Sequence, residues 1–482
     1  MKCRWIYLAV AFLFVSTATA ANDEPTTLAE VLRSARAYSP LVHAAAAQVR
    51  EREADITRAQ GAFDHRLEAG INSRLSGYYG GTAATATVTR PLKAMNAEAF
   101  ASYRLGDGAF PVYDGGALTG TLGEARIGVA LSLLRDREID DRRYALARAE
   151  VEAQSQRHAF RAQLVSLQQQ AYVAYTRWLI AQRLLEAYRE LLAVAEQRGQ
   201  ALQRRVDRGD VAAFLLAENE QAILQRKALV VDATRQAGVA AETLSLYLRD
   251  ADGRPRRPVY DPALAMPADD LDLLMLPLRE LLERAFTRRP DIAIADLARE
   301  VATLERDLAQ NEALPRLDLS LYASRDFGQR AAALRGTDSV ADLRLSVPLE
   351  RRQARGREAA AAARIEGLSE RIRFLYEQAE VDLEVALLNV RATRDLEQVA
   401  RQEYAAAQSL AVAEGRRFEA GLSDFFLLNQ RERSIAEAAL KRWQAHLDHQ
   451  IALAGFHAAS MNLEALGLGD DPALPPTPGG AT

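Results

Sequence analysis

The 482-residue sequence has a single cysteine, and its prolines are unevenly distributed. Cys3 lies within the first 20 residues, so the rest of the chain has no thiol for a disulfide, a thiolate metal ligand or a lipid anchor. No proline lies between Pro111 and Pro255 or between Pro348 and Pro472. Because proline breaks helix interiors, the sequence leaves two very long segments free to form continuous helix.

Long hydrophobic runs are also missing after the first residues, which argues against a second membrane-spanning helix. The N-terminus has Lys2 and Arg4, then an apolar run, and it ends in Ala18-Thr19-Ala20, as a secretory signal peptide does. We therefore expect residues 1–20 to be an export signal. The formal net charge of −4 gives no reason to expect nucleic acid as a partner.

Both proline-free segments carry the spacing of long packed helices. In the first, apolar residues recur every seven positions and a second set fills the interleaved positions, which is heptad spacing. It predicts a helix from Arg143 to Arg205, about 95 Å long at 1.5 Å per residue. A similar stripe begins at Ile365 in the second segment. The residues of the first heptad set are Leu164, Ala171, Trp178, Leu185 and Leu192.

Each long helix is followed by a glycine and a Phe-Leu-Leu block. Gly209 and Gly421 lie 212 positions apart (421 − 209), and the same offset separates the two blocks. A glycine inside a helix costs about 1 kcal/mol relative to alanine, so we predict a turn at each glycine. Each copy is then the tip of an antiparallel helical hairpin, with Asp210 or Ser423 as the cap of the returning helix.

The repetition extends over most of the chain. Residues 28–40 align with residues 278–290 at an offset of 250, which falls to 212 at the tips, so the first copy carries 38 extra residues (250 − 212). We assign them to a long loop in the Gly-rich and Thr-rich region 77–123, in which Gly106 and Gly108 are interpreted as loop residues. The predicted organisation is a signal peptide (1–20), a first repeat (21–250), a loop-rich crossover (251–277), a second repeat (278–466) and a disordered tail (467–482).

Short alternating segments flank the extra residues and recur in the second repeat. They predict four amphipathic strands near Leu67, Ile127, Leu317 and Leu343, each long enough to cross a bilayer. Four strands do not close a barrel, and an open edge in lipid leaves backbone groups unpaired. Strands that span a membrane therefore require an oligomer that pools them. The alternative is a pair of hairpins in a soluble sheet.

In its order of elements the sequence resembles the outer-membrane efflux protein family, the TolC-type exit ducts. The resemblance rests on the signal peptide, the duplication, two strands per repeat, the strand-to-helix step at Val347-Pro348-Leu349 and the glycine tips. It implies a mainly α fold with transmembrane β-strands: a homotrimer with a 12-stranded outer-membrane β-barrel and a coiled-coil α-barrel in the periplasm of a Gram-negative bacterium. It also implies partners, namely a periplasmic adaptor (membrane fusion) protein and an inner-membrane pump.

The same resemblance turns the tips into candidate functional sites. Residues expected to dock the adaptor or pack at the tips are Gly209, Phe214, Leu215, Gly421, Phe426 and Leu427. Charged residues that are candidates for a periplasmic gate are Arg204, Arg205, Asp207, Asp210, Arg416, Arg417, Glu419 and Asp424. Each of these charges also fits the simpler interpretation of a solvated helix end.

The sequence gives no sign of an enzyme. His446 and His449 could share one helix face, but two ligands without a third do not make a zinc site, so we expect no metal and no cofactor. Glycine pairs such as Gly106 and Gly108 lack the Lys-Ser/Thr of a phosphate loop. The predicted function is a passive exit duct for efflux or secretion; the alternative is a periplasmic adaptor or helical scaffold protein. The sequence does not identify the substrate.

Overall fold

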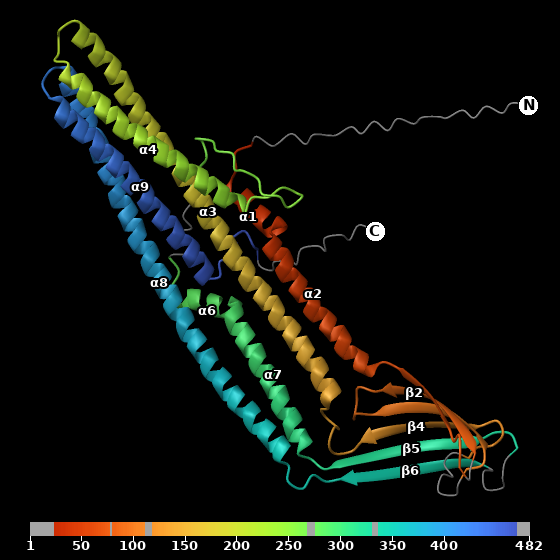
Figure 1. Cartoon of the computed structure of the whole chain (residues 1–482). Coiled ribbons are helices and arrows are strands. Elements are labelled where there is room, and N and C mark those ends of the chain that lie inside the picture. Colours follow the sequence, from red (N-terminus) through yellow and green to blue (C-terminus); the bar gives the residue numbers. More distant parts are fainter. Residues whose placement is uncertain (1–23, 78–79, 111–117, 268–274, 330–335, 470–482) are drawn as a thin grey trace, which may run out of the picture.

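The computed structural model describes residues 24–77, 80–110, 118–267, 275–329 and 336–469. In these residues the molecule is elongated, with a β-sheet at one end, two helical tips at the other and a shaft of long helices between them (Figure 1). The expected signal peptide lies outside the described residues.

Two sets of helices with matching lengths follow one another along the chain. Each set has a helix of 11 residues, one of 21 or 23, one of 67 or 68 and one of 32 or 35. The two sets fall within residues 21–250 and 278–466, the ranges predicted for the two repeats. The first set is α1 (Leu28–Tyr38), α2 (Pro40–Gln60), α3 (Asp141–Asp207) and α4 (Phe214–Ser245), and the second is α6 (Leu278–Arg288), α7 (Pro290–Glu312), α8 (Arg352–Glu419) and α9 (Phe425–Ala459).

Helix α3 forms where the heptads predict it. Asp140 caps its first turn by accepting hydrogen bonds from the N–H groups of Arg142 and Arg143 at 2.8 and 3.0 Å. Its heptad residues Leu164 and Trp178 are buried, as are the other members of the set up to residue 185. With 67 residues the helix is about 100 Å long. The long helix thus follows from a buried stripe and a well-capped start.

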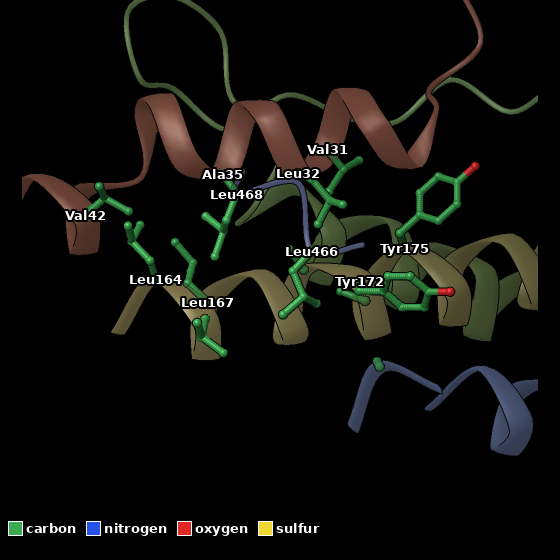
Figure 2. Packing of buried hydrophobic residues seen from close by; sticks show 14 of the residues in the cluster. Val31, Leu32, Ala35, Val42, Leu164, Leu167, Tyr172, Tyr175, Leu466 and Leu468 are labelled. Atoms are coloured by element: carbon green, nitrogen blue, oxygen red, sulfur yellow. The ribbon is translucent and has the colours of Figure 1, made fainter. Parts of the chain in front are cut away.

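Different helices lie side by side in the two halves of the shaft. Near the sheet the neighbours are α2 with α3, α3 with α7, and α7 with α8; near the tips they are α4 with α3, α3 with α9, and α9 with α8. Each half therefore contains four helices side by side. Figure 2 shows the largest core cluster, in which Val31, Leu32 and Ala35 of α1 face α3 and Leu466 and Leu468 lie between the two helices.

The crossover and the chain after α9 also contact the core. In the crossover, Tyr260 packs edge-on against Trp178 at 6.0 Å between ring centroids, and its hydroxyl donates to Glu186 at 2.6 Å. Leu466 and Leu468 are buried in the cluster of Figure 2. The predicted disordered tail therefore began too early, at residue 467, since Leu468 packs in the core. Residues 470–482 lie outside the described part.

In the described residues, a single antiparallel sheet of six strands lies at the end of the molecule opposite the tips. Its strands pair in chain order, so each is hydrogen-bonded to the one before it and the one after it, and β1 and β6 form the edges. The strands are β1 (Arg66–Ser73), β2 (Gly81–Pro91), β3 (Glu98–Gly108), β4 (Glu124–Ser132), β5 (Arg316–Asp326) and β6 (Thr337–Ser346).

The prediction of four strands per chain was wrong. The four predicted strands are β1, β4, β5 and β6, and the region interpreted as an extra loop contains β2 and β3 as a further hairpin. The signal was weak because small residues alternate there: β2 reads GTAATATVTRP, with alanine where a strand usually has a larger side chain. Gly106 and Gly108, interpreted as loop residues, pair with Ala83 and Gly81.

None of the helices in the described ranges is both long and apolar enough to cross a membrane.

Candidate functional site: a two-faced sheet and two helical tips

One face of the sheet is apolar and exposed. The antiparallel register places Leu67, Val88, Ala101, Ile127 and Ala323 in one row across five strands. Ile127 is 67% exposed, although it is a large aliphatic residue in the middle of a strand. Soluble proteins rarely leave so large a contiguous apolar surface in water. Other exposed residues of this face are Ile71, Tyr103, Leu105, Val129, Leu321, Leu343 and Leu345.

The opposite face of the sheet is polar and internally paired. Glu124 is buried, and its carboxylate pairs with Arg104 and, at 3.4 Å, with Arg126. The Arg126 guanidinium lies over the Tyr322 ring, 4.5 Å from its centroid. Ser132 donates a hydrogen bond to Asp318 at 2.9 Å across β4 and β5. The two faces thus differ in the way that a lipid-facing and a water-facing surface differ.

Both tips have the same backbone geometry. Gly209 and Gly421 have φ angles of 79° and 74°, in the left-handed region that glycine adopts without strain. In each tip the glycine N–H donates to the carbonyl three residues earlier, at 2.9 and 3.0 Å, and the next N–H donates to the carbonyl five residues earlier, at 2.9 and 2.8 Å. This pair of bonds is the Schellman ending of a helix. Each glycine therefore forms a turn at the predicted place.

The returning helices start differently. Asp424 caps α9 by accepting a hydrogen bond from the N–H of Leu427 at 2.7 Å. Helix α4 has Ala213 at the corresponding position, with no side-chain cap. The predicted caps, Asp210 and Ser423, were therefore wrong. For Ser423 the error is one residue, because an aspartate directly after it has the same capping chemistry.

The predicted docking residues separate into exposed and half-buried groups. Phe214 and Phe426 are 62% and 73% exposed, whereas Leu215 and Leu427 are half-buried. The sequence reasoning missed Phe425, which is 2% exposed and packs edge-on against Phe418 with ring centroids 6.2 Å apart. A Phe-Phe pair at a helix start places one ring inward and one outward, and the sequence alone does not say which.

Most candidate gate charges make only local contacts within this chain. Asp207 accepts from Gln203 at 2.8 Å, Asp210 pairs with Arg208 at 3.1 Å, and Arg417 lies 3.8 Å from Glu414. The Arg204 side chain donates to the carbonyl of the residue four positions earlier, at 3.3 Å. Arg416 is exposed, and Arg205 and Glu419 line one pocket between α3 and α8 below the tips.

A buried ionic cluster below the tips was not predicted. Glu432 of α9 is 7% exposed and lies between Arg198 of α3 and Arg226 of α4. Arg198 donates to its carboxylate at 2.9 Å and Arg226 at 2.5 Å. Burial lowers the pKa of Arg226, and the charge of Glu432 opposes that shift. The cluster joins three helices through charges that are removed from water.

A second buried pair joins α8 and α9 farther from the tips. His446 Nδ1 lies 2.7 Å from a Glu397 carboxylate oxygen, and Arg401 also contacts that carboxylate. Burial acts to raise the pKa of Glu397, but the hydrogen bond with His446 and the charges of His446 and Arg401 lower it to about 2. His449 instead lies 3.2 Å from the Thr393 hydroxyl. Among the described residues, no group of three or more His, Cys, Asp or Glu side chains could hold a metal ion.

The sequence matches no model of a protein family, and it matches no curated protein. Several solved structures do match. A membrane protein from Pseudomonas aeruginosa is 19% identical with a TM-score of 0.62, over 90% of this chain and 93% of that one. The outer membrane protein VceC from Vibrio cholerae is 15% identical with a TM-score of 0.62, over 90% and 96%. The Campylobacter jejuni CmeC outer membrane channel is 11% identical with a TM-score of 0.61, over 92% and 90%.

These matches span nearly the whole of both chains in each case. The chain therefore has the fold of the TolC-type outer-membrane channels, as its order of elements predicted.

Proposed function

We propose that the protein is the exit duct of a tripartite efflux or secretion system in the outer membrane of a Gram-negative bacterium. Three copies would join their sheets into one barrel in the membrane and their helices into one tube in the periplasm. The duct would be passive, and an inner-membrane pump would supply the energy. A periplasmic adaptor protein would connect the pump to the tips.

The observation that carries this proposal is the two-faced sheet. Its apolar face is exposed across the strands, while its other face buries Glu124 among arginines. In a closed barrel the apolar face would meet lipid and the paired charges would face a water-filled lumen. The edges β1 and β6 would pair between copies, since an unpaired edge is not tolerated in hydrocarbon.

The helices support the periplasmic part of the proposal. Helices α3 and α8 have 67 and 68 residues, which is about 100 Å each, far longer than a bilayer is thick. They extend from the sheet to the tips, as Figure 1 shows. Side by side, three sets of four helices would enclose a continuous channel. The tips would then form the end that faces the adaptor and the pump.

Exposed aromatic side chains at the tips fit a docking role. Phe214 and Phe426 lie at the starts of the two returning helices, and Leu422 beside them is also exposed. Aromatic side chains in exposed positions are typical anchors of protein interfaces. The gate would involve charges of neighbouring copies, because Arg416 is exposed and Asp424 accepts from the backbone of its own helix.

The test uses a pair of adjacent residues that point to opposite faces of β1. Ile71 is 78% exposed on the apolar face, and Asn72 is exposed on the polar face. We expect Ile71→Arg to reduce the amount of protein assembled in outer-membrane fractions, since arginine on the lipid face of a barrel strand is unfavourable. Asn72→Arg is the matched control and should assemble normally.

Light scattering of the detergent-extracted protein gives the second readout. A trimer from the outer-membrane fraction is expected. Equal assembly of the two variants, or release of the protein without detergent, would contradict the exit-duct proposal and favour an adaptor or scaffold protein.

A further inference from the structure

The hairpin of β2 and β3 is part of the sheet and does not fold over it. Strand β2 pairs with β1 from Arg66 to Ser73, and β3 pairs with β4 from Glu98 to Arg104. The two strands pair with each other over their full lengths of 11 residues. Between β1 and β4, therefore, the sheet contains two strands that have no counterpart among the described residues of the second repeat.

The hairpin continues both faces of the sheet. On the apolar face, Val88 and Ala101 lie between Leu67 of β1 and Ile127 of β4 in one row. On the polar face, Arg104 of β3 pairs with the buried Glu124 of β4. Because side chains alternate along a strand, only a hairpin in this register places its small apolar residues on the exposed side and its polar residues on the other.

Gly128 allows β3 and β5 side chains to pack closely against β4. A Cβ atom on Gly128 of β4 would lie 2.6 Å from the Phe100 ring of β3 and 2.5 Å from the Tyr322 side chain of β5. The two rings lie 6.4 Å apart over this glycine. An aromatic ring that covers a glycine on the neighbouring strand stabilises the pairing of those strands. The Phe100 ring thus packs the hairpin against Gly128 of β4 and Tyr322 of β5.

We propose that the barrel of this protein has 18 strands, six from each of three copies, and not the 12 strands that the family resemblance implied. This inference depends on the proposed trimer. A hairpin adds two strands, so the number per copy stays even and β6 of one copy still runs antiparallel to β1 of the next. The alternation of faces is kept as well. A single added strand would make the number of strands per copy odd, and β6 of one copy would then run parallel to β1 of the next.

The added strands change the width of the opening. With strands 4.8 Å apart and tilted by about 40°, 18 strands give a circumference of about 110 Å and a diameter of about 35 Å. Twelve strands at the same tilt give about 75 Å and about 25 Å. Next to the sheet each copy provides the four helices α2, α3, α7 and α8. Twelve helices packed about 9 Å apart also need a circumference of about 110 Å.

The wider barrel would therefore continue the helical tube at nearly the same width. Solutes of large cross-section, such as polypeptides, would meet no narrowing at the membrane. The step that selects solutes by size would lie at the tip end of the tube.

Electron microscopy of the purified protein in lipid nanodiscs tests the strand number directly. We expect a trimer with 18 strands in its barrel. A trimer with 12 strands would overturn the wide barrel and leave the exit-duct proposal intact. A monomer without a membrane-spanning barrel would overturn the exit-duct proposal itself, so the two failures are distinguishable.

Pairs of introduced cysteines test the placement of the hairpin independently, since Cys3 is the only native cysteine. Ala101 and Ile127 are partners across β3 and β4, so Ala101→Cys with Ile127→Cys should cross-link within one chain in membranes. Leu67→Cys with Ile127→Cys should not, because two strands separate them. Cross-linking of the second pair in place of the first would put the hairpin outside the sheet and overturn the inference.

A positive control for this experiment lies on the same face. Leu319 and Leu343 are partners across β5 and β6, and their cysteine pair should cross-link whichever way the hairpin folds.

Discussion

Removing the buried carboxylate below the tips should loosen them. Glu432 contacts the guanidinium groups of Arg198 and Arg226, and the side chains of Glu432 and Arg226 are 9% and 8% exposed. In Glu432→Gln both cations lose their counter-charge but stay buried. Breaking a buried ion pair in this way costs about 3–5 kcal/mol, and a glutamine that keeps some hydrogen bonds puts the expected cost near 3 kcal/mol.

Hydrogen exchange of the purified trimer measures this loss where it occurs. A cost of about 3 kcal/mol increases local opening about 100-fold, so amide exchange should accelerate by about that factor in the tip segments of α3, α4 and α9. Exchange near the sheet should stay unchanged. Glu437→Gln is the matched control, because Glu437 is exposed five residues later on the same helix.

A second substitution tests the electrostatic reason. Adding Arg226→Met to Glu432→Gln removes one uncompensated cation and should restore part of the protection, since an apolar replacement of a buried ionic group is often neutral. The reasoning is refuted if Glu432→Gln exchanges no faster than Glu437→Gln, or if the double variant is less protected than the single one.

Three further predictions concern other parts of the shaft and the tips. The pKa of Glu397 is lowered to about 2 from 4.5, so its carboxylate contributes stability above pH 4.5 that is lost as the pH falls toward 2. Glu397→Gln should therefore remove about 3 kcal/mol of the acid dependence of the unfolding free energy. Denaturant unfolding followed by circular dichroism measures this change. Gly209→Ala should lower the free energy of unfolding by about 1–2 kcal/mol, because a φ of 79° is strained for alanine; no atom crowds the Cβ position, so the strain is the whole cost. Gly238→Ala inside α4 should instead raise the free energy of unfolding by about 1 kcal/mol. Phe425→Ala should cost about 3–5 kcal/mol of stability, because this ring is buried. Phe426→Ala should change stability by less than about 0.5 kcal/mol but weaken adaptor binding in a pull-down assay. The opposite ranking of the two stabilities would contradict the assignment of Phe425 as the inward ring.

The long helices and the tips could be predicted from the sequence because their signals are local and repeated. Heptads with buried members such as Leu164 and Trp178 specify one packed face over many turns. The paired glycines required by left-handed turns appear at the same place in both repeats, Gly209 and Gly421. Two independent copies of one signal made a weak pattern reliable.

The hairpin of β2 and β3 and the ionic clusters could not be predicted for two different reasons. Alanine and threonine alternate in β2, and their difference in polarity is too small to mark two faces of a strand. No sequence pattern distinguishes Glu432 and Arg226 from the charged residues that usually lie in solvent on a helix. Their burial follows from the packing of α3, α4 and α9, which brings Arg198, Arg226 and Glu432 together away from water.

The difference between the repeats also follows from geometry. Corresponding helices differ in length by three residues at most, since both hairpins extend from the same sheet and must reach the same tip level. A longer helix in one repeat would push its tip out of line with the other. A sheet has no such restriction, because a hairpin inserted between β1 and β4 keeps every strand direction and both faces. Divergence by whole hairpins is therefore tolerated in the sheet, and that is where the first repeat differs from the second.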